Sequence, residues 1–296
     1  MKPLDTKSRV APKNILLATD FSPAAEAALP YALALTRHYG SELHVAHVIC
    51  PELMDLLSPE ETATKLQQAR ESAKQRMEPW LTAGHLKGIS CRPLIGEGAI
   101  SDVLLDMVHQ NGIDLIIMGT HGRQGLGKLL RGSVAEEVFR MAPCPVLTVG
   151  PKTSGASSRD VQLSHVLYPV EFVPDTSLAA DYAISLAEEY RARLTFMKVL
   201  DQTSPSPEEK AQIQEPVRHW LDDHIPVESD LRERTSFELG FGRAAEAIQK
   251  FATDRGVDLI VMSVRREDPT LAAHLPEADT AYEVVRTAPC PVLTVR

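Results

Sequence analysis

The sequence lacks the features of a disulfide-rich, zinc-binding or membrane-spanning protein. Its four cysteines, Cys50, Cys91, Cys144 and Cys290, are widely spaced and form no CxxC pair. This spacing indicates neither a disulfide framework nor a zinc site, and we expect reduced, buried thiols. No apolar run approaches the roughly 20 residues that a membrane-spanning helix needs. A membrane role is therefore not expected.

Basic residues are also in short supply. The chain has 31 lysines and arginines against 40 aspartates and glutamates, a formal net charge of −9. This balance argues against a broad nucleic-acid-binding surface, although it leaves room for a small basic pocket. The opening segment MKPLDTKSRVAPKN is polar and lacks the apolar centre of a secretion signal. These absences predict a cytoplasmic protein with no nucleic-acid partner.

The two halves of the chain repeat each other. The matching segments are APCPVLTV at 142–149 and 288–295, DLIIMG at 114–119 and DLIVMS at 258–263, and NILLATDFSP at 14–23 and HVLYPVEFVP at 165–174. Trp80 and Trp220 also fall at comparable points, and we interpret them as packing residues. The length of 296 residues suits two domains of roughly 150 residues each. We predict homologous domains at 1–150 and 164–296, joined by a linker at 151–163 that is rich in Ser, Gly and charge.

Each half alternates short apolar runs with longer amphipathic segments. The apolar runs of the first half are ILLAT, LHVAHVI, CRPLI, DLIIMG and PVLTV. Such runs are typical of strands covered on both faces, and the segment 24–40, which ends on Gly40, has a helical pattern. The alternation predicts the α/β class: each domain is a doubly wound, five-stranded parallel sheet with helices on both faces, Rossmann-like. Ligands of such sheets bind at the carboxyl ends of the strands, where the strand order reverses.

A glycine-rich loop, GTHGRQGLGKLLRGS at 119–133, directly follows the apolar run DLIIM. We expect Gly119 to end its strand where a side chain would intrude on a ligand, and Gly122 to let the loop turn its amides toward an anion. Gly132 and Ser133 open a helix whose first turn offers free amide donors and a positive dipole end. Positive charge close by comes from Arg123, Lys128 and Arg131. The loop therefore predicts a phosphate-binding site.

The spacing Gly119-x2-Gly122-x9-Gly132-Ser133, between an apolar strand and a helix, resembles the nucleotide-binding signature of the universal stress protein family, in its ATP-binding branch. ATDFS at 18–22 and HVI at 47–49 are similar to that family's first and second strand ends. The resemblance covers nearly the whole chain as two tandem family domains. It implies a stress-response sensor or regulator that binds ATP, with or without Mg²⁺, in its first domain.

The resemblance also implies which residues bind the nucleotide. They are Ala18, Thr19, Asp20, Val48, Met118, Gly119, His121, Gly122, Arg123, Gly132, Ser133, Val134 and Ala135. Within this set the backbone around Ala18, Thr19 and Val48 would hold the adenine. Val134 and Ala135, at the start of the helix, would flank the phosphates.

Several of these residues also have a purely structural interpretation. Asp20 is placed to accept hydrogen bonds from a ribose hydroxyl or a base edge, but it could instead cap the helix that follows. Ser133 and Glu136 form a capping-box pattern that would stabilise a helix start without any ligand. A lone histidine on a polar loop, such as His121, is more often incidental than catalytic. The paired glycines Gly96-x-Gly98 and Gly240-x-Gly242 recur in both halves and favour a strand-to-helix turn.

A second phosphate-binding motif overlaps the same loop. Gly122 to Lys128 matches GxxxxGK, the start of a Walker A loop, but Leu129 stands where Ser or Thr should bind magnesium. Because glycines crowd this segment, such a match arises easily by accident. We therefore disfavour the Walker A interpretation.

The second half has lost the residues of the phosphate-binding pattern. When the two repeats are aligned, the second has Ser263 at the position of Gly119, Arg266 at that of Gly122, Ala278 at that of Gly132, Asp279 at that of Ser133 and Glu171 at that of Asp20. A carboxylate at position 279 would still cap a helix but would repel a phosphate. We predict a degenerate second domain and one ATP per chain.

The last predicted strand of each half indicates how the two halves assemble. PVLTV at 145–149 and at 291–295 would be the last strand of each sheet, and an apolar edge tends to find a partner. Members of the family that this chain resembles form dimers joined along this edge. We therefore predict an intramolecular pseudo-dimer with the two strands adjacent, and a homodimer of whole chains stays an open alternative.

The sequence shows no obvious nucleophile, metal cluster or acid–base pair, so an enzyme is not the default interpretation. The alternatives are a slow ATPase, in which His121 or Asp20 assists a water, and a structural interaction module with an empty loop.

Overall fold

The computed structural model describes residues 10–51, 59–82, 86–120, 134–150, 153, 161–170, 177–201, 205–225, 229–264 and 280–296. The chain divides into two compact units. The larger unit comprises residues 12–161 and 263–296, and the smaller unit comprises residues 1–11 and 162–262.

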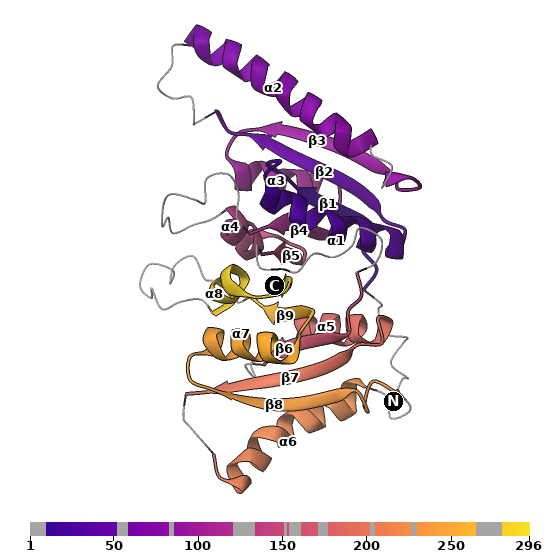
Figure 1. Cartoon of the computed structure of the whole chain (residues 1–296), viewed down its shortest axis with the longest axis vertical. Coiled ribbons are helices and arrows are strands. Elements are labelled where there is room, and N and C mark those ends of the chain that lie inside the picture. Colours follow the sequence, from indigo (N-terminus) through magenta and orange to yellow (C-terminus); the bar gives the residue numbers. More distant parts are fainter. Residues whose placement is uncertain are drawn as a thin grey trace. The chain divides into compact units, whose positions relative to one another are not determined.

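The larger unit is an α/β fold built on a parallel sheet. Its elements are β1 (Asn14–Ala18), α1 (Pro23–Tyr39), β2 (Glu42–Ile49), α2 (Pro59–Thr82), β3 (Cys91–Glu97), α3 (Ile100–Gln110), β4 (Leu115–Gly119), α4 (Val134–Met141), β5 (Val146–Val149), α8 (Thr280–Thr287) and β10 (Val292–Val295). The strands β3, β2, β1, β4 and β5 lie side by side in that order and run parallel (Figure 1). The strand order reverses between β1 and β4, as the doubly wound fold requires.

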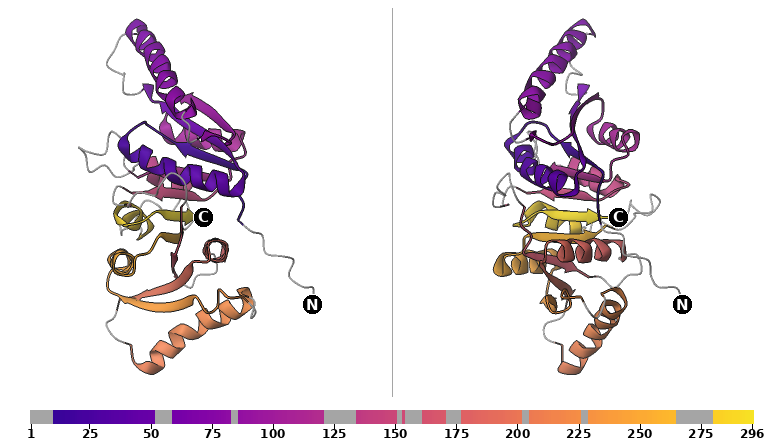
Figure 2. Two further views of the ribbon diagram at one scale, coloured as in Figure 1. Left: turned by 45° about the vertical axis from the view of Figure 1, so that its right-hand side comes forward. Right: turned by 90° about the vertical axis from the view of Figure 1, so that its right-hand side faces the viewer.

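Helices cover both faces of this sheet. A Cβ added to Gly119 of β4 would meet the backbone of α1, whereas one added to Gly96 of β3 would meet side chains of α3. Helices α1 and α3 therefore lie on opposite faces of the strands (Figure 2). The strand residues between them form the core, and Leu16, Ile116 and Ile117 are completely buried. This arrangement confirms the predicted fold class.

The predicted helix end and the paired-glycine turns are also confirmed. Helix α1 ends at Gly40, whose φ of 66° is in the left-handed region, and the Gly40 N–H donates to the Thr36 carbonyl. Gly98, with φ of 139°, follows β3, and a Cβ at Gly96 would lie 2.4 Å from Val103 Cγ1. The turn after β3 is thus a structural connection into α3.

The smaller unit repeats the same arrangement. Its elements are β6 (His165–Pro169), α5 (Ser177–Glu189), β7 (Arg193–Leu200), α6 (Pro207–His224), β8 (Thr235–Phe241), α7 (Ala244–Arg255) and β9 (Leu259–Ser263), of which Ser263 belongs to the larger unit. The parallel pairs β9–β6, β6–β7 and β7–β8 reproduce the order of β4, β1, β2 and β3. The glycine turn recurs as well, since Gly242 has φ of 90° and its N–H donates to the Leu200 carbonyl at 2.9 Å.

The two PVLTV strands pair with each other, as the sequence predicts. β10 runs antiparallel to β5, with Leu293 opposite Leu147 at the centre of the pair. The hydroxyl of Thr148 donates to the Val292 carbonyl, and that of Thr294 donates to the Val146 carbonyl, each at 3.1 Å. The two hydrogen bonds are equivalent, so the pair has the local two-fold symmetry of an isologous contact. This pairing explains why residues 263–296 belong to the larger unit.

A repeated aspartate fixes the start of the first strand in each half. Asp114 Oδ2 accepts hydrogen bonds from the N–H groups of Lys13, at 2.8 Å, and Asn14, at 3.0 Å. Asp258 Oδ2 accepts from Ser164 and His165 at the same two distances, 2.8 and 3.0 Å. The first residue of the DLI repeat is therefore a structural clamp between two strands.

Replacing either clamp aspartate by alanine should destabilise its own unit. Asp114→Ala and Asp258→Ala each remove two hydrogen bonds to a charged acceptor, so we expect each to lower the free energy of unfolding by about 1–3 kcal/mol. Asp254→Ala, at an exposed position of α7, is the control. Urea denaturation followed by circular dichroism measures the difference, and a clamp variant as stable as Asp254→Ala would contradict the assignment.

Candidate functional site

The carboxyl ends of β1 and β4 form the centre of the candidate site. These strands are neighbours where the strand order reverses, and Ala18 pairs with Met118 across them. Ala18 and Met118 are buried, at 8% and 6% exposure, whereas Asp20 and Val48 are half-buried. At this edge of the sheet two buried apolar residues are thus followed, two residues after Ala18, by a partly exposed carboxylate.

The phosphate-binding part of the prediction lies outside the described residues. That part comprises His121, Gly122, Arg123, Gly132 and Ser133. The described chain resumes with Val134, which is half-buried, and Ala135, which is 4% exposed. These two residues lie in the first turn of α4, as predicted, while the predicted opening of the helix at Gly132 and Ser133 lies outside the described residues.

Two acidic side chains in the first turn of α4 have partners within the larger unit. Glu136 pairs with Arg140 one turn later, at 3.2 Å, and Glu137 accepts a hydrogen bond from the Ser101 hydroxyl of α3. Acidic residues at this end of a helix also interact favourably with its dipole. The first turn of α4 is thus stabilised by its own side chains.

The segment Thr19–Ser22, which we call the Phe21 turn, follows β1 and is held by its own side chains. The Thr19 hydroxyl oxygen accepts from the Phe21 N–H, and Asp20 Oδ1 accepts from the Ser22 N–H, each at 2.9 Å. Phe21 has φ of 58°, a left-handed conformation that residues other than glycine rarely adopt. These bonds orient the Asp20 side chain.

The alternative role of Asp20 as a helix cap is wrong. The N-cap of α1 is Ser22, whose hydroxyl oxygen accepts from the Ala25 N–H at 3.2 Å. Asp20 lies two residues earlier, and its carboxylate bonds the backbone of Ser22 instead. Its position at the end of β1 is therefore not explained by capping.

Two side chains that the sequence analysis did not single out also hold the Phe21 turn. His47 Nδ1 lies 2.8 Å from the Thr19 carbonyl oxygen, and because a carbonyl only accepts, this nitrogen carries the hydrogen. Arg76 Nη2 of α2 donates to the Phe21 carbonyl at 2.8 Å, and its guanidinium carbon lies 4.6 Å from the centre of the Phe21 ring. Trp80 packs edge-on against the same ring, at 5.7 Å between centroids, which agrees with its predicted packing role.

Gly119 has a packing role that the sequence analysis did not predict. A Cβ at this position would lie 2.5 Å from the carbonyl oxygen and 2.9 Å from the carbonyl carbon of Ala24, in the first turn of α1. The close approach of the α1 backbone therefore requires a glycine here whether or not a ligand binds. The expectation that a side chain here would also intrude on a ligand stays a prediction.

The described residues limit the other kinds of site. No group of three or more His, Cys, Asp or Glu side chains that could hold a metal ion occurs among them. None of the described helices is long and apolar enough to cross a membrane.

All four cysteines are free thiols, but only Cys290 is fully buried. This corrects the expectation that the other three are buried as well. Burial raises the pKa of Cys91 to about 11 and that of Cys144 to about 12, so both thiols stay protonated near neutral pH.

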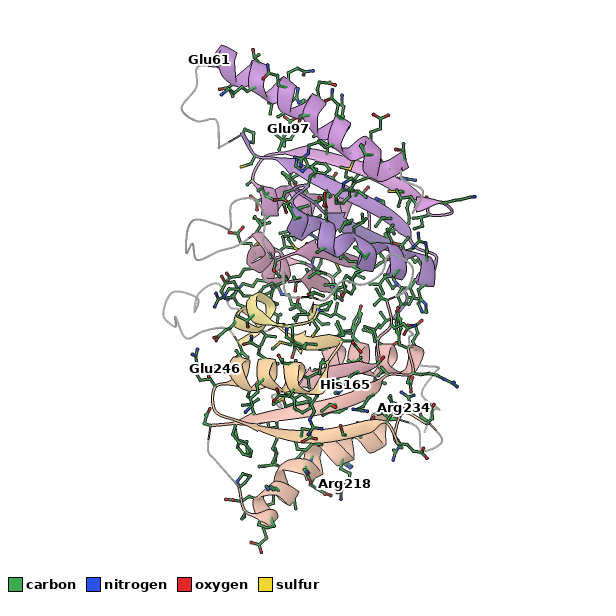
Figure 3. The ribbon with its side chains drawn as sticks, viewed as in Figure 1. Glu61, Glu97, His165, Arg218, Arg234 and Glu246 are labelled. Atoms are coloured by element: carbon green, nitrogen blue, oxygen red, sulfur yellow. The ribbon has the colours of Figure 1, made fainter. Side chains whose placement is uncertain are left out.

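Two buried histidines are not among the candidate site residues. His44 of β2 is 2% exposed, and within the described residues neither of its ring nitrogens has a hydrogen-bond partner. Burial lowers the pKa of His44. The charge of Glu42 raises this pKa by a smaller amount, and the charge of Arg92 lowers it further. Burial also lowers the pKa of His165, labelled on β6 in Figure 3, whose Nε2 lies 2.8 Å from the Thr195 hydroxyl oxygen.

These lowered pKa values predict a loss of stability in mild acid. The folded chain takes up protons at His44 and His165 less readily than the unfolded chain, so stability is retained above a pH of about 6.5 and lost as the pH falls through the folded pKa. Urea midpoints measured from pH 8 to pH 5 test this. His44→Leu should reduce the pH dependence, whereas His109→Leu, at an exposed position of α3, should not. An unchanged slope in His44→Leu would show that His44 does not contribute.

Comparison with known proteins agrees with the fold of both halves. The model of the universal stress protein family matches residues 12–150 and 163–296. A universal stress protein from Methanocaldococcus jannaschii is 32% identical over 157 residues, which cover 48% of this chain and 97% of that protein. One from Thermus aquaticus is 34% identical over 138 residues, which cover 46% of this chain and 98% of that protein. The crystal structure of a universal stress protein from Archaeoglobus fulgidus covers 96% of each chain at 19% identity, with a TM-score of 0.67, and thus shares the fold. Because the family model matches both halves, the chain belongs to the universal stress protein family.

Proposed function

We propose that this protein binds ATP, with or without Mg²⁺, in its first half and acts as a cytoplasmic stress-response sensor or regulator. The observation that most supports this proposal is the pairing of β1 with β4 where the strand order reverses. One of these strands continues into the Phe21 turn with Asp20, and the other ends at Gly119, where the glycine-rich loop begins. Nucleotides bind at this location in doubly wound sheets.

The proposed site has two parts, one for the base and ribose and one for the phosphates. The backbone around Ala18, Thr19 and Val48 would hold the base, and the oriented carboxylate of Asp20 can accept a hydrogen bond from a ribose hydroxyl. The phosphates would lie against the amides of the glycine-rich loop and the first turn of α4, which begins at Val134. The proposed ligand residues beyond Gly119 rest on the sequence pattern.

The second half is proposed to be a degenerate domain that binds no nucleotide. The proposed domains are residues 1–150 and 164–296, with a linker at 151–163. In the second domain Ser263 occupies the position of Gly119, and Arg266 and Asp279 occupy those of Gly122 and Ser133. Side chains at these positions would block the approach of a phosphate chain or repel it.

Binding is tested by releasing any ligand that copurifies with the chain. Mass spectrometry of the supernatant after denaturation should detect an adenine nucleotide, and titration calorimetry of the nucleotide-free protein should give a defined affinity for ATP. Absence of binding at millimolar ATP would instead favour a structural interaction module with an empty loop.

Turnover distinguishes a sensor from a slow ATPase. The glycine-rich loop offers charge stabilisation for a phosphoryl group more plainly than it offers an oriented nucleophile, so we expect ATP hydrolysis to be very slow or absent. Phosphate release under saturating ATP measures this. Steady multiple turnover that disappears in His121→Ala, with ATP affinity unchanged, would establish the ATPase instead.

A further inference from the structure

The Phe21 turn is held at three consecutive peptide groups. The first, between Thr19 and Asp20, has its carbonyl bonded by His47 at 2.8 Å. The second, between Asp20 and Phe21, has its N–H bonded by the Thr19 hydroxyl at 2.9 Å. The third, between Phe21 and Ser22, has its carbonyl bonded by Arg76 at 2.8 Å. No peptide group on either side of Asp20 can therefore rotate without breaking a hydrogen bond.

Aromatic packing supports the same turn from the side of α2. Arg76 lies over the face of the Phe21 ring, Trp80 meets the ring edge-on, and the His47 ring lies 4.7 Å from it. The left-handed φ of Phe21 is thus maintained by side chains of β2 and α2 that are 26 to 59 residues away in the chain. A rarely populated backbone conformation that is held so fully points to a function for the turn.

The second half provides an internal comparison for each of these contacts. The aromatic partners are repeated, since Phe172 and Trp220 stand at the positions of Phe21 and Trp80. The three polar side chains differ: Val170 replaces Thr19, Lys198 replaces His47 and Pro216 replaces Arg76. The half with the degenerate phosphate pattern therefore also lacks the Thr, His and Arg side chains that hold the Phe21 turn.

The structure supports this alignment. The Val170 N–H donates to the Met197 carbonyl at 2.8 Å, just as the Thr19 N–H donates to the Ala46 carbonyl at 2.8 Å. This places Lys198, the next residue of β7, at the position of His47 in β2. On the helices, Met77 and Val217 are buried at equivalent positions, which places Pro216 at the position of Arg76.

We propose that Thr19, His47 and Arg76 are positioning residues of the nucleotide site, which hold the Phe21 turn so that Asp20 meets the ligand already oriented. This inference rests on the proposed function. The α/β fold itself forms in both halves, so it does not need these three side chains. A turn fixed before binding loses little freedom on binding, and this raises affinity without a direct contact to the ligand.

The test compares two arginines of the same helix. Arg76→Met removes the hydrogen bond to the Phe21 turn, whereas Arg70→Met removes an arginine that pairs with Glu97 of β3, labelled in Figure 3. We expect titration calorimetry to show ATP affinity reduced at least about tenfold in Arg76→Met and changed less than about twofold in Arg70→Met. Arg76→Lys, which keeps a charged donor, should recover part of the loss.

A second measurement follows the turn in the absence of ligand. In a Trp220→Phe background Trp80 is the only tryptophan, since the chain has two. Because Trp80 packs on Phe21, its emission should shift in Arg76→Met and stay unchanged in Arg70→Met. Circular dichroism confirms that all variants remain folded.

The outcomes separate this inference from the proposed function. If the wild type binds ATP and Arg76→Met binds it equally well, the inference is wrong while the function stands, even if the variant melts at a lower temperature. If the wild type does not bind ATP, the proposed function fails and the inference fails with it. A tenfold loss in Arg76→Met, with partial recovery in Arg76→Lys and a shifted Trp80 emission, supports the positioning role.

Discussion

Gly119→Ala is expected to lower the free energy of unfolding of the larger unit by about 3 kcal/mol, near the upper end of the usual cost of overpacking. The added Cβ would lie 2.5 Å from the Ala24 carbonyl oxygen and 3.2 Å from the Ala25 nitrogen. Both are backbone atoms, so no side-chain rotation can relieve the clash. The start of α1 would have to move away from β4, which lies between β1 and β5.

Gly150→Ala provides the matched control for this prediction. It adds the same methyl group after β5, but the nearest atom, the Ala288 carbonyl oxygen, is 3.6 Å from the new Cβ. We expect this variant to be as stable as the wild type or slightly more stable, since alanine reduces the freedom of the unfolded chain. Urea denaturation of the two variants measures the difference. Equal stability would mean that α1 adjusts freely and that Gly119 is not needed for packing.

The fold could be predicted from the sequence because its determinants are local and occur twice. The apolar runs around Leu16 and Ile116 are short, bounded by turn residues and repeated in the second half, so they predict parallel strands. Gly40 marks the end of α1 by its own conformation. The pairing of β5 with β10 was also predictable, because a repeated apolar edge strand needs a partner.

The contacts that organise the candidate site were less predictable. Asp20 and Ser22 are both good N-cap residues two positions apart, and only the structure identifies Ser22 as the cap. Arg76 reaches the Phe21 carbonyl across 55 residues, so no local spacing indicates it. The clamp by Asp114 joins two strands 100 residues apart and fixes backbone N–H groups, which have no sequence signature. In each case the partner is determined by the tertiary fold.

Gly122→Val should reduce ATP affinity by more than about 150-fold, beyond the range expected for the loss of one hydrogen bond and the largest binding effect we expect from a single substitution in the chain. Gly122 lies outside the described residues, so this expectation rests on the Gly119-x2-Gly122-x9-Gly132-Ser133 spacing. A branched side chain there would keep the phosphates away from several backbone amides at once. Ser133→Ala removes a single hydrogen bond and should cost only about 1–3 kcal/mol of binding free energy, roughly 5- to 150-fold in affinity. Calorimetry ranks the two variants.

The same titration counts the sites, and the second half supplies the matched control. Arg266 occupies the position of Gly122 in the repeat, so Arg266→Val places valine at the equivalent point of the proposed degenerate domain. Since that domain is expected to bind no nucleotide, Arg266→Val should leave both the affinity and a stoichiometry of about one ATP per chain unchanged. A wild-type stoichiometry near two would show that the second half still binds nucleotide despite its lost glycines. Undiminished binding by Gly122→Val would show that the phosphates do not lie against this loop, because a branched side chain at this position would keep them away from its backbone amides.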